Sequence, residues 1–344
     1  MAIEILKPID IRPKAGEYKI KPELENAIEV AMLFNQPLLL TGEPGTGKTL
    51  LAYYVAKQLH EATINAVAGE CQFSPTPLKF NTKTSSIARD LFYTYDAVGH
   101  FQNANIAKEE TRIIKKTENF IELQAFGKAI AMANPKAEYV SNFIWKNNPT
   151  PQSSVVLVDE IDKAPRDFTN DILSEIEQYE FFIKEKNYQV RLNDKAETKN
   201  DNADTKNDNA YTKNPQRILV IMTSNSEKNL PDAFLRRCVF FHIEFPKKED
   251  GFLLEILKGQ LTIPETTVSA NNLKMVHDLF YDLRKAAIRK KPATAELVAF
   301  VKMLEIKGVL EKEDLNVKQW YLDNLALVAK TKEDIDAIRR KLTV

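Results

Sequence analysis

The sequence predicts an α/β fold built around a parallel β-sheet, followed by a smaller helical region. Two short apolar runs, 155–158 and 218–222, have the length and composition of strands that are buried on both faces. A third apolar run, 38–40, is followed by a glycine-rich turn and then by apolar residues at helical spacing in 50–59. From residue 247 onward the apolar spacing is helical. We therefore expect the sheet before residue 247 and helices after it.

The glycine-rich turn at 42–49 matches the pattern G-x-x-x-x-G-K-T of a phosphate-binding loop. Glycines let the backbone turn its N–H groups toward phosphates, and the following helix N-terminus adds partial positive charge. In such a loop Lys48 reaches the β- and γ-phosphates and the Thr49 hydroxyl ligates Mg²⁺. A glycine-rich connection without a ligand is the alternative, and the flanking strand and helix favour phosphate binding. The residues expected to bind nucleotide here are Gly42, Glu43, Pro44, Gly45, Thr46, Gly47, Lys48, Thr49 and Leu50.

Two carboxylates, Asp159 and Glu160, end the apolar run 155–158. The carboxyl end of a parallel strand is where ligands bind in open α/β sheets. We expect Asp159 to contact the nucleotide's Mg²⁺, largely through the water shell of the ion, and Glu160 to orient or deprotonate the attacking water. Taken alone, the pair could equally cap the helix predicted at 165–179, but the phosphate-binding loop upstream favours catalysis.

Asn225 follows the other buried run, 218–222. If the two runs are neighbouring strands, its amide lies next to Glu160 and positions the same water. Turn formation by the asparagine is the alternative. The nucleotide is expected to be ATP, because the guanine-reading pattern N-K-x-D is absent from the sequence.

Composition limits the remaining functions. Lysine plus arginine and aspartate plus glutamate both number 48 among 344 residues, without a long basic run, so strong nucleic-acid binding is not expected. The 44% hydrophobic content suffices for a core, and the length predicts one larger and one smaller domain. Cys71 and Cys238 have neither metal-ligand nor disulfide-framework spacing, which favours reduced structural thiols. The charged N-terminus and the lack of an apolar run near 18 residues predict a cytoplasmic protein without a membrane partner.

The other elements follow from local periodicity. Aromatic side chains at 92–101 could stack on bases or pack in a core, and the absence of basic neighbours favours the core. The predicted elements are a helix over 21–33, a strand over 78–81, helices over 85–98, 121–133 and 165–179, a hairpin over 181–192, an edge strand over 239–243 and C-terminal helices over 252–261, 272–286, 294–307, 317–330 and 332–342.

Residues 196–216 consist of three copies of one seven-residue unit rich in Asn, Asp and Lys. The unit lacks the pair of apolar positions that a coiled coil needs. It cannot bury enough apolar surface to order itself, so we expect a disordered surface insertion.

The segments 42–49, 155–160, 218–225 and 230–238 occur in the order and approximate spacing of an AAA+ ATPase, and the chain resembles the MoxR-like branch of that family. The resemblance implies an αβα P-loop NTPase sandwich over 1–246 and a small α-helical lid domain over 247–344. It makes 42–49 the Walker A motif, Asp159 and Glu160 the Walker B motif and Asn225 sensor 1. Arg237, with Arg236 beside it, falls where the family places the arginine finger that reaches a neighbouring subunit's γ-phosphate.

Other family features have partial counterparts. Residues 181–192 are similar to the family's hairpin between the Walker B helix and the sensor 1 strand. Parts of 85–120 are similar to its insertion in the helix that follows the P-loop helix. The sensor 2 arginine is absent from the matching region, 288–297, so that either Lys290 or Lys291 substitutes for it or the role is lost.

The resemblance also implies an activity and partners. It implies hydrolysis of Mg²⁺-ATP in a homo-oligomeric, hexameric ring that remodels or chaperones a protein partner, in this family often a von Willebrand factor A domain protein. One alternative is a nucleic-acid-directed NTPase of the restriction or replication type, which the balanced charge disfavours. Another is a nucleotide-switched scaffold with little turnover, which would not need Glu160 and Asn225.

Overall fold

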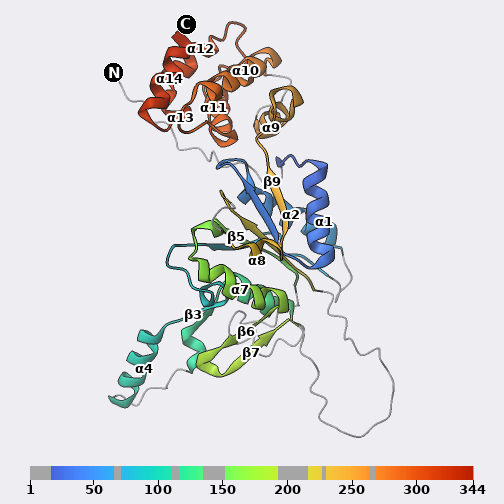
Figure 1. Cartoon of the computed structure of the whole chain (residues 1–344), viewed down its shortest axis with the longest axis vertical. Coiled ribbons are helices and arrows are strands. Elements are labelled where there is room, and N and C mark those ends of the chain that lie inside the picture. Colours follow the sequence, from blue (N-terminus) through green and yellow to red (C-terminus); the bar gives the residue numbers. More distant parts are fainter. Residues whose placement is uncertain are drawn as a thin grey trace. The chain divides into compact units, whose positions relative to one another are not determined.

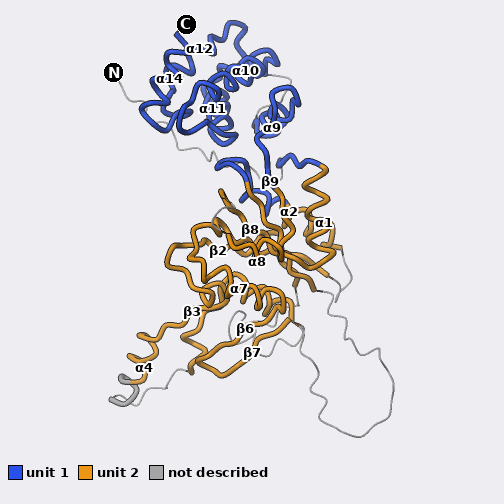
Figure 2. Tube along the Cα trace, viewed as in Figure 1, with its two compact units in different colours: residues 1–21, 42–54, 242–344 blue, residues 22–41, 55–241 orange. Residues whose placement is uncertain are grey.

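The computed structural model describes residues 17–65, 71–109, 116–134, 152–192, 216–226, 230–262 and 268–343. Figure 1 labels the helices and strands, and Figure 2 colours the two compact units into which the chain divides. The sheet unit comprises residues 22–41 and 55–241, and the lid unit comprises residues 1–21, 42–54 and 242–344. The division predicted at residue 246 stays a prediction.

The sheet unit is built on a five-stranded sheet, and its strand order brings together segments that are far apart in the sequence. The pairs β2 with β5, β5 with β8 and β8 with β1 are parallel. Every residue of β1, β5 and β8 is buried, as the apolar runs predict. The carboxyl ends of these three strands therefore meet at one edge of the sheet. In spatial order the strands are β2 (Leu78–Asn81), β5 (Ser154–Asp159), β8 (Ile218–Thr223), β1 (Leu38–Gly42) and β9 (Val239–Ile243).

The helices and two small antiparallel sheets complete this unit. Strands β3 and β4 pair with each other, and β6 and β7 form the hairpin predicted at 181–192. Helix α2 begins in the lid unit and continues into the sheet unit. These elements are α1 (Pro22–Phe34), α2 (Lys48–Thr63), α3 (Arg89–Phe92), β3 (Tyr93–Tyr95), α4 (Ala97–Glu109), β4 (Ile121–Leu123), α5 (Ala125–Ala133), α7 (Arg166–Gln178), β6 (Glu180–Ile183), β7 (Tyr188–Arg191) and α8 (Asp232–Leu235).

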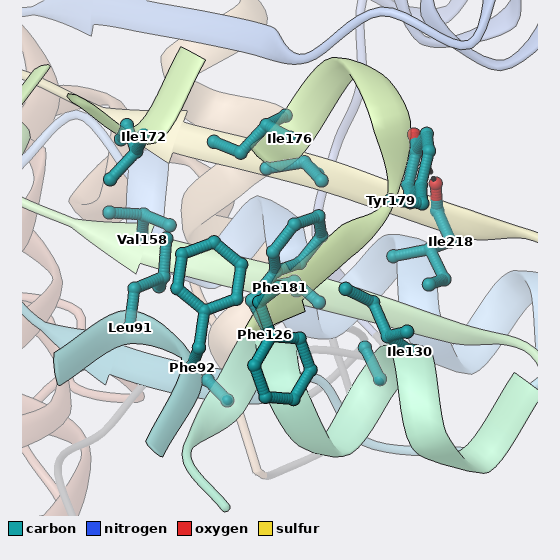
Figure 3. Close-up of a cluster of buried hydrophobic side chains, with 14 of the residues drawn as sticks. Leu91, Phe92, Phe126, Ile130, Val158, Ile172, Ile176, Tyr179, Phe181 and Ile218 are labelled. Carbon is teal, nitrogen blue, oxygen red and sulfur yellow. Dashed lines mark hydrogen bonds between the residues drawn. The ribbon is translucent and has the colours of Figure 1, made fainter. Parts of the chain in front are cut away.

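One face of the sheet packs into an aromatic-rich core, which Figure 3 shows in close-up. The Phe92 ring contacts both Phe126 and Phe181, with centroid distances of 5.4 and 5.2 Å. Ile172 and Ile176 of α7 add to the same cluster. Burial of Phe92 supports the core interpretation of the aromatic segment, although Phe101 is 69% exposed.

The helix predicted over 85–98 is wrong, and the one predicted over 121–133 begins too early. In their place a single turn of helix, α3, is followed by β3, and α5 is preceded by β4. Tyr93 pairs with Leu123 and Tyr95 with Ile121 in the antiparallel ladder. Aromatic and β-branched residues suit such a ladder once a partner strand is present, so tertiary pairing outweighs the local helical spacing.

The lid unit contains the predicted C-terminal helices around their own apolar core. The Tyr321 ring stacks on Phe300 at 3.9 Å between centroids. The helix predicted over 317–330 is divided at Asn324 into two shorter ones. The helices of this unit are α9 (Phe252–Gln260), α10 (Ala270–Ala286), α11 (Thr294–Ile306), α12 (Val317–Asp323), α13 (Leu325–Val328) and α14 (Lys332–Thr343).

Most of the seven-residue repeats, 196–215, lie outside the described residues, so their predicted disorder stays a prediction. Among the helices that the structure describes, none combines the length and the apolar character needed to cross a membrane.

Candidate functional site

The segment that begins at the end of β1 has a backbone that favours glycine, most clearly at Gly42 and Gly47. Gly42 has a φ of 146° and Gly47 a φ of 90°, values that residues with side chains rarely adopt. A Cβ atom on Gly42 would lie 2.6 Å from the carbonyl oxygen of Ile243, and one on Gly47 would lie 3.1 Å from the ring of Tyr18. Helix α2 begins directly afterwards at Lys48. The segment therefore has the predicted form of a tight turn that ends in a helix N-terminus.

Lys48 is buried beneath this loop. Its Nζ donates hydrogen bonds to the carbonyl oxygens of Gly42 at 2.8 Å and Glu43 at 2.9 Å. The Thr46 hydroxyl donates to the Glu43 carbonyl at 2.8 Å and ties the loop together from the other side. Carbonyl oxygens are weaker partners for an ammonium group than phosphate oxygens are, so a bound phosphate would attract this charge.

Arg284, in the last turn of α10, contacts the same loop and was not identified from the sequence. Its guanidinium donates from Nη2 to the side-chain carboxylate of Glu43 and from Nη1 to the carbonyl oxygen of Pro292 at 2.6 Å. The group also lies 3.7 Å from the ring centroid of Phe245, a cation–π contact. No local sequence pattern predicts this role, because Arg284 and Glu43 are 241 residues apart.

Lys290 and Lys291, the sequence-based candidates for sensor 2, have exposed side chains. Asp334 fixes the backbone of this segment. Its carboxylate accepts hydrogen bonds from the N–H groups of Ile288, Arg289 and Lys290. Within the lid unit, it is Arg284 and not either lysine that is hydrogen-bonded to a Walker A side chain.

The carboxylate of Asp159 lies at the carboxyl end of β5 in the sheet unit. The Thr223 hydroxyl, at the end of neighbouring β8, donates to Oδ1 of Asp159 at 2.7 Å. Lys79, on β2 at the other side of β5, places its Nζ 2.7 Å from Oδ2. Asp159 is thus held from both neighbouring strands.

Glu160 directly follows and has a left-handed backbone, with a φ of 57°. Its N–H donates to the same Thr223 hydroxyl at 2.9 Å, so one hydroxyl fixes both acidic residues. The side chain of Glu160 accepts a hydrogen bond from Lys163, which raises the pKa of Lys163. Thr223 is a second residue that the sequence analysis missed, although its place two residues before Asn225 offered a signal.

Asn225 follows β8, which the sheet places next to β5, so the condition for its predicted role is met. Its backbone N–H lies 3.4 Å from Oδ1 of Asp162, and its side chain is exposed. Arg236 and Arg237 follow α8 and are exposed as well. Arg237 forms an ion pair with Glu177 of α7, 2.6 Å between Nε and Oε1.

A comparison with known protein families identifies the family of the chain. Residues 37–238, more than half of the chain, match the family described as AAA domain (dynein-related subfamily). The chain belongs to this AAA family. The matched range contains the Walker A loop, Asp159, Glu160, Asn225 and both arginines.

This AAA domain has short matches to curated proteins. It is similar to the Holliday junction branch migration complex subunit RuvB of Prochlorococcus marinus, with 36% identity over 61 residues for strain MIT 9312 and 33% over 61 residues for strain AS9601. Each match covers 17% of this chain and 17% of the relative, so only about a sixth of the length of these relatives is represented.

Among solved structures, similar chains include domain III of the replication initiation protein DnaA from Thermotoga maritima, with a TM-score of 0.44, 11% identity and coverage of 92% of this chain and 97% of that one. NtrX from Brucella abortus has a TM-score of 0.44 and 14% identity, over 93% of this chain and 58% of that one. The FIGL-1 AAA domain has a TM-score of 0.40 and 14% identity, over 92% and 85%.

The donor set of this AAA domain fits Mg²⁺ better than a metal held wholly by protein. Among the described residues, no three His, Cys, Asp or Glu side chains gather as a metal cluster. Within the sheet unit, Asp159 offers a carboxylate, an oxygen donor. Mg²⁺ characteristically keeps several waters and binds through one or two carboxylates together with nucleotide phosphates.

Proposed function

We propose that this AAA domain hydrolyses Mg²⁺-ATP in a homo-oligomeric ring of the MoxR-like branch and uses the resulting motion to remodel or chaperone a protein partner. One observation carries the proposal. The Thr223 hydroxyl holds Asp159 and Glu160 together at the carboxyl end of buried parallel strands, in a chain whose preceding loop has a glycine-dependent backbone and a buried lysine. Family membership supports the same reading, since ATPase activity is general among AAA domains.

Each residue has a distinct chemical task. Lys48 transfers its hydrogen bonds from the loop carbonyls to the β- and γ-phosphates, and Thr49 and Asp159 supply oxygens for Mg²⁺, Asp159 largely through water. The metal neutralises phosphate charge when bound. Glu160 accepts the proton of the attacking water, and the Asn225 amide orients that water. A residue that only caps a helix would not need the contacts from both neighbouring strands that hold Asp159.

Arg237, and Arg236 beside it, complete a neighbouring subunit's site in the proposed ring. Exposure of both side chains supports this role, because an arginine that acts on another subunit must be accessible on its own. The ion pair with Glu177 keeps the Arg237 side chain in one orientation until a neighbour is present. We expect the ring to be hexameric.

Two small sheets support assignment to the MoxR-like branch. The β6–β7 hairpin follows α7 and precedes β8, and the β3–β4 pair lies between the P-loop helix and β5. These are the positions of the two features that the sequence resemblance implies. A von Willebrand factor A domain protein is the partner class that follows from this branch, and the cytoplasm is the expected compartment.

A nucleic-acid-directed NTPase is the second candidate, and the short RuvB matches favour it. The balanced charge of the chain disfavours it, because nucleic-acid binding depends on clustered basic residues. Stimulation of the ATPase by double-stranded or single-stranded DNA at low salt would support this candidate. An unchanged rate at all DNA concentrations would support the protein-remodelling proposal.

The decisive experiment compares Lys48→Ala with Glu160→Gln. We expect Lys48→Ala to lose nucleotide binding and Glu160→Gln to bind Mg²⁺-ATP without turning it over, measured by fluorescent-nucleotide titration and phosphate release. Equal loss of binding in both variants, or turnover by Glu160→Gln at the wild-type rate, would contradict the assignment. The ATP-bound Glu160→Gln protein then serves as a trap to capture the partner, with Lys48→Ala as the matched control.

A further inference from the structure

The carboxylate of Asp159 contacts Thr223 and Lys79, and the proposed mechanism gives no task to Lys79. It lies on β2, which pairs in parallel with β5 so that Asn81 is opposite Asp159 and Lys79 is opposite Leu157. Alternate residues of a strand share a face, so Lys79 and Asp159 project from the same side of the sheet. The Nζ atom is 2.7 Å from Oδ2 of Asp159.

Among the lysine pairs in the described part of the sheet unit, this one is better shielded from water than those of Lys57, Lys128 and Lys163, and about as well shielded as that of Lys186. The side chain of Asp159 is 12% exposed and that of Lys79 is 30% exposed. By comparison, Lys128 lies 3.8 Å from Glu122, whose side chain is 74% exposed. Exposed pairs contribute little because solvent and salt screen them, whereas a partly buried pair at hydrogen-bond distance keeps more of its attraction.

The position does not require a lysine for folding. Leu78 and Phe80, on the opposite face of β2, pack against the core, while Lys79 turns away from it. The charge is therefore explained by its partner, Asp159, and not by packing.

The pair conflicts with the role proposed for Asp159. An ammonium ion and Mg²⁺ are attracted to the same carboxylate, and Oδ1 is already an acceptor for Thr223. Two cations beside one carboxylate repel each other, so each weakens the binding of the other. We propose that Lys79 is a built-in counter-ion that competes with Mg²⁺ for Asp159 and thereby raises the Mg²⁺ concentration needed for tight nucleotide binding. The inference rests on the proposed Mg²⁺-nucleotide function.

Two consequences follow. Without metal, Lys79 neutralises Asp159, so the carboxylate keeps its place between β2 and β8. When Mg²⁺ and nucleotide arrive, the Lys79 ammonium withdraws from Oδ2. Lys79 is a positioning residue, because it acts on the metal through Asp159.

The test measures binding of a fluorescent ADP analogue to the full chain across a series of free Mg²⁺ concentrations and in EDTA. ADP avoids turnover, so the readout is affinity. Lys79→Met removes the charge and keeps an unbranched side chain that is one atom shorter. Lys79→Arg keeps the charge, and Lys128→Met is the matched control from an exposed pair. We expect Lys79→Met to lower the Mg²⁺ midpoint roughly tenfold, with metal-free affinity unchanged, and the other two variants to resemble wild type.

Thermal melting provides a second measurement. Metal-free Lys79→Met is expected to melt below wild type, because Asp159 loses its counter-ion, and Mg²⁺-ADP is expected to remove the difference. If Lys79→Met does not fold, Lys79→Gln replaces it in both measurements.

Three results would overturn the inference. An unchanged Mg²⁺ midpoint in Lys79→Met would exclude competition. An equal loss of affinity in EDTA and in Mg²⁺ would assign Lys79 to the nucleotide phosphates. If wild type bound no nucleotide at any Mg²⁺ concentration, the proposed function itself would fail, and the inference with it.

Discussion

The Arg284 guanidinium holds the Glu43 carboxylate of the Walker A loop, although 241 residues separate the two in sequence. The same group donates to the Pro292 carbonyl and lies over the Phe245 ring. One planar side chain therefore joins three segments of the lid unit, and its fork geometry is what allows the two donations to proceed in different directions.

We predict that Arg284→Lys lowers the free energy of unfolding by about 1–3 kcal/mol. A lysine ammonium lacks the planar, forked donors of the guanidinium and leaves the buried carbonyl of Pro292 without its donor. The measurement is urea unfolding followed by circular dichroism. Arg289→Lys is the matched control, since Arg289 pairs with Glu333 on an exposed surface and should shift the midpoint very little. Equal midpoints for the two variants would show that the guanidinium fork of Arg284 adds no stability beyond that of a single positive charge.

Thr223 offers a second prediction. Thr223→Val keeps the shape of the side chain but removes the donor to Asp159 and the acceptor for the Glu160 N–H. We expect phosphate release to fall at least about tenfold while nucleotide affinity changes much less, because the two acidic residues lose their common support. Thr223→Ser keeps the hydroxyl and should retain most of the activity. A Thr223→Val enzyme with the wild-type rate would remove this hydroxyl from the mechanism.

The location of Arg237 predicts complementation between subunits. Arg237→Ala and Lys48→Ala should each be inactive alone, since arginine fingers contribute rate factors of roughly 10³ or more. Mixed at fixed total protein, they should regain part of the activity, because a Lys48→Ala subunit still offers Arg237 to the intact loop of its neighbour. Size-exclusion chromatography checks co-assembly. Glu177→Gln, which removes the ion-pair partner of Arg237, should stay active. No recovery in proven mixed assemblies would place Arg237 outside a neighbour's site.

Asp334 predicts a pH dependence of lid stability. Burial alone would raise its pKa, but hydrogen bonds from the Arg289 N–H, the Thr331 hydroxyl and the N–H groups of Ile288 and Lys290 outweigh burial and lower the pKa to about 2. The unfolded carboxyl has a pKa of about 3.9. The contribution is therefore complete above about pH 4 and is lost as the pH falls toward about 2.

The check is thermal melting of wild type and Asp334→Asn across this range. The variant should be less stable near neutral pH, by about 1–3 kcal/mol, because its amide is a poorer acceptor for three backbone N–H groups. The difference between the two proteins should shrink as the pH falls through the window. A constant difference would mean that the charge of Asp334 contributes nothing.

Local sequence patterns were sufficient for the central part of this molecule. The strands that end at Gly42, Asp159 and Thr223 each contain an uninterrupted apolar run. The glycine-rich loop, Asp159 and Asn225, which the sequence assigned to chemistry, follow these runs, whereas Thr223 was missed. Such runs are reliable because full burial on both faces demands them. The same holds for the C-terminal helices, whose apolar spacing leads directly to the lid core.

The missed features depend on contacts between distant segments. Tyr93 lies in a strand because Leu123 pairs with it from a neighbouring strand. The sequence around Tyr93 contains no signal that predicts this partner. Lys79 pairs with the carboxylate of Asp159 and Arg284 with that of Glu43, and both partners lie on other segments of the chain. In the sequence, each of these two basic residues looks like an ordinary surface charge. The ion pairs that they form are therefore visible only in the folded structure.

Glu160, the residue proposed as the general base, has a left-handed backbone conformation with a φ of 57°, which glycine adopts at a lower energetic cost. A non-glycine residue in this region costs on the order of 1 kcal/mol. Selection for thermal stability alone would favour glycine or asparagine at this position. The resulting protein would be more stable but would lack the general base that activates the attacking water. Glu160 is therefore a point at which durability and turnover oppose each other, and a library selected only for heat resistance should lose it early.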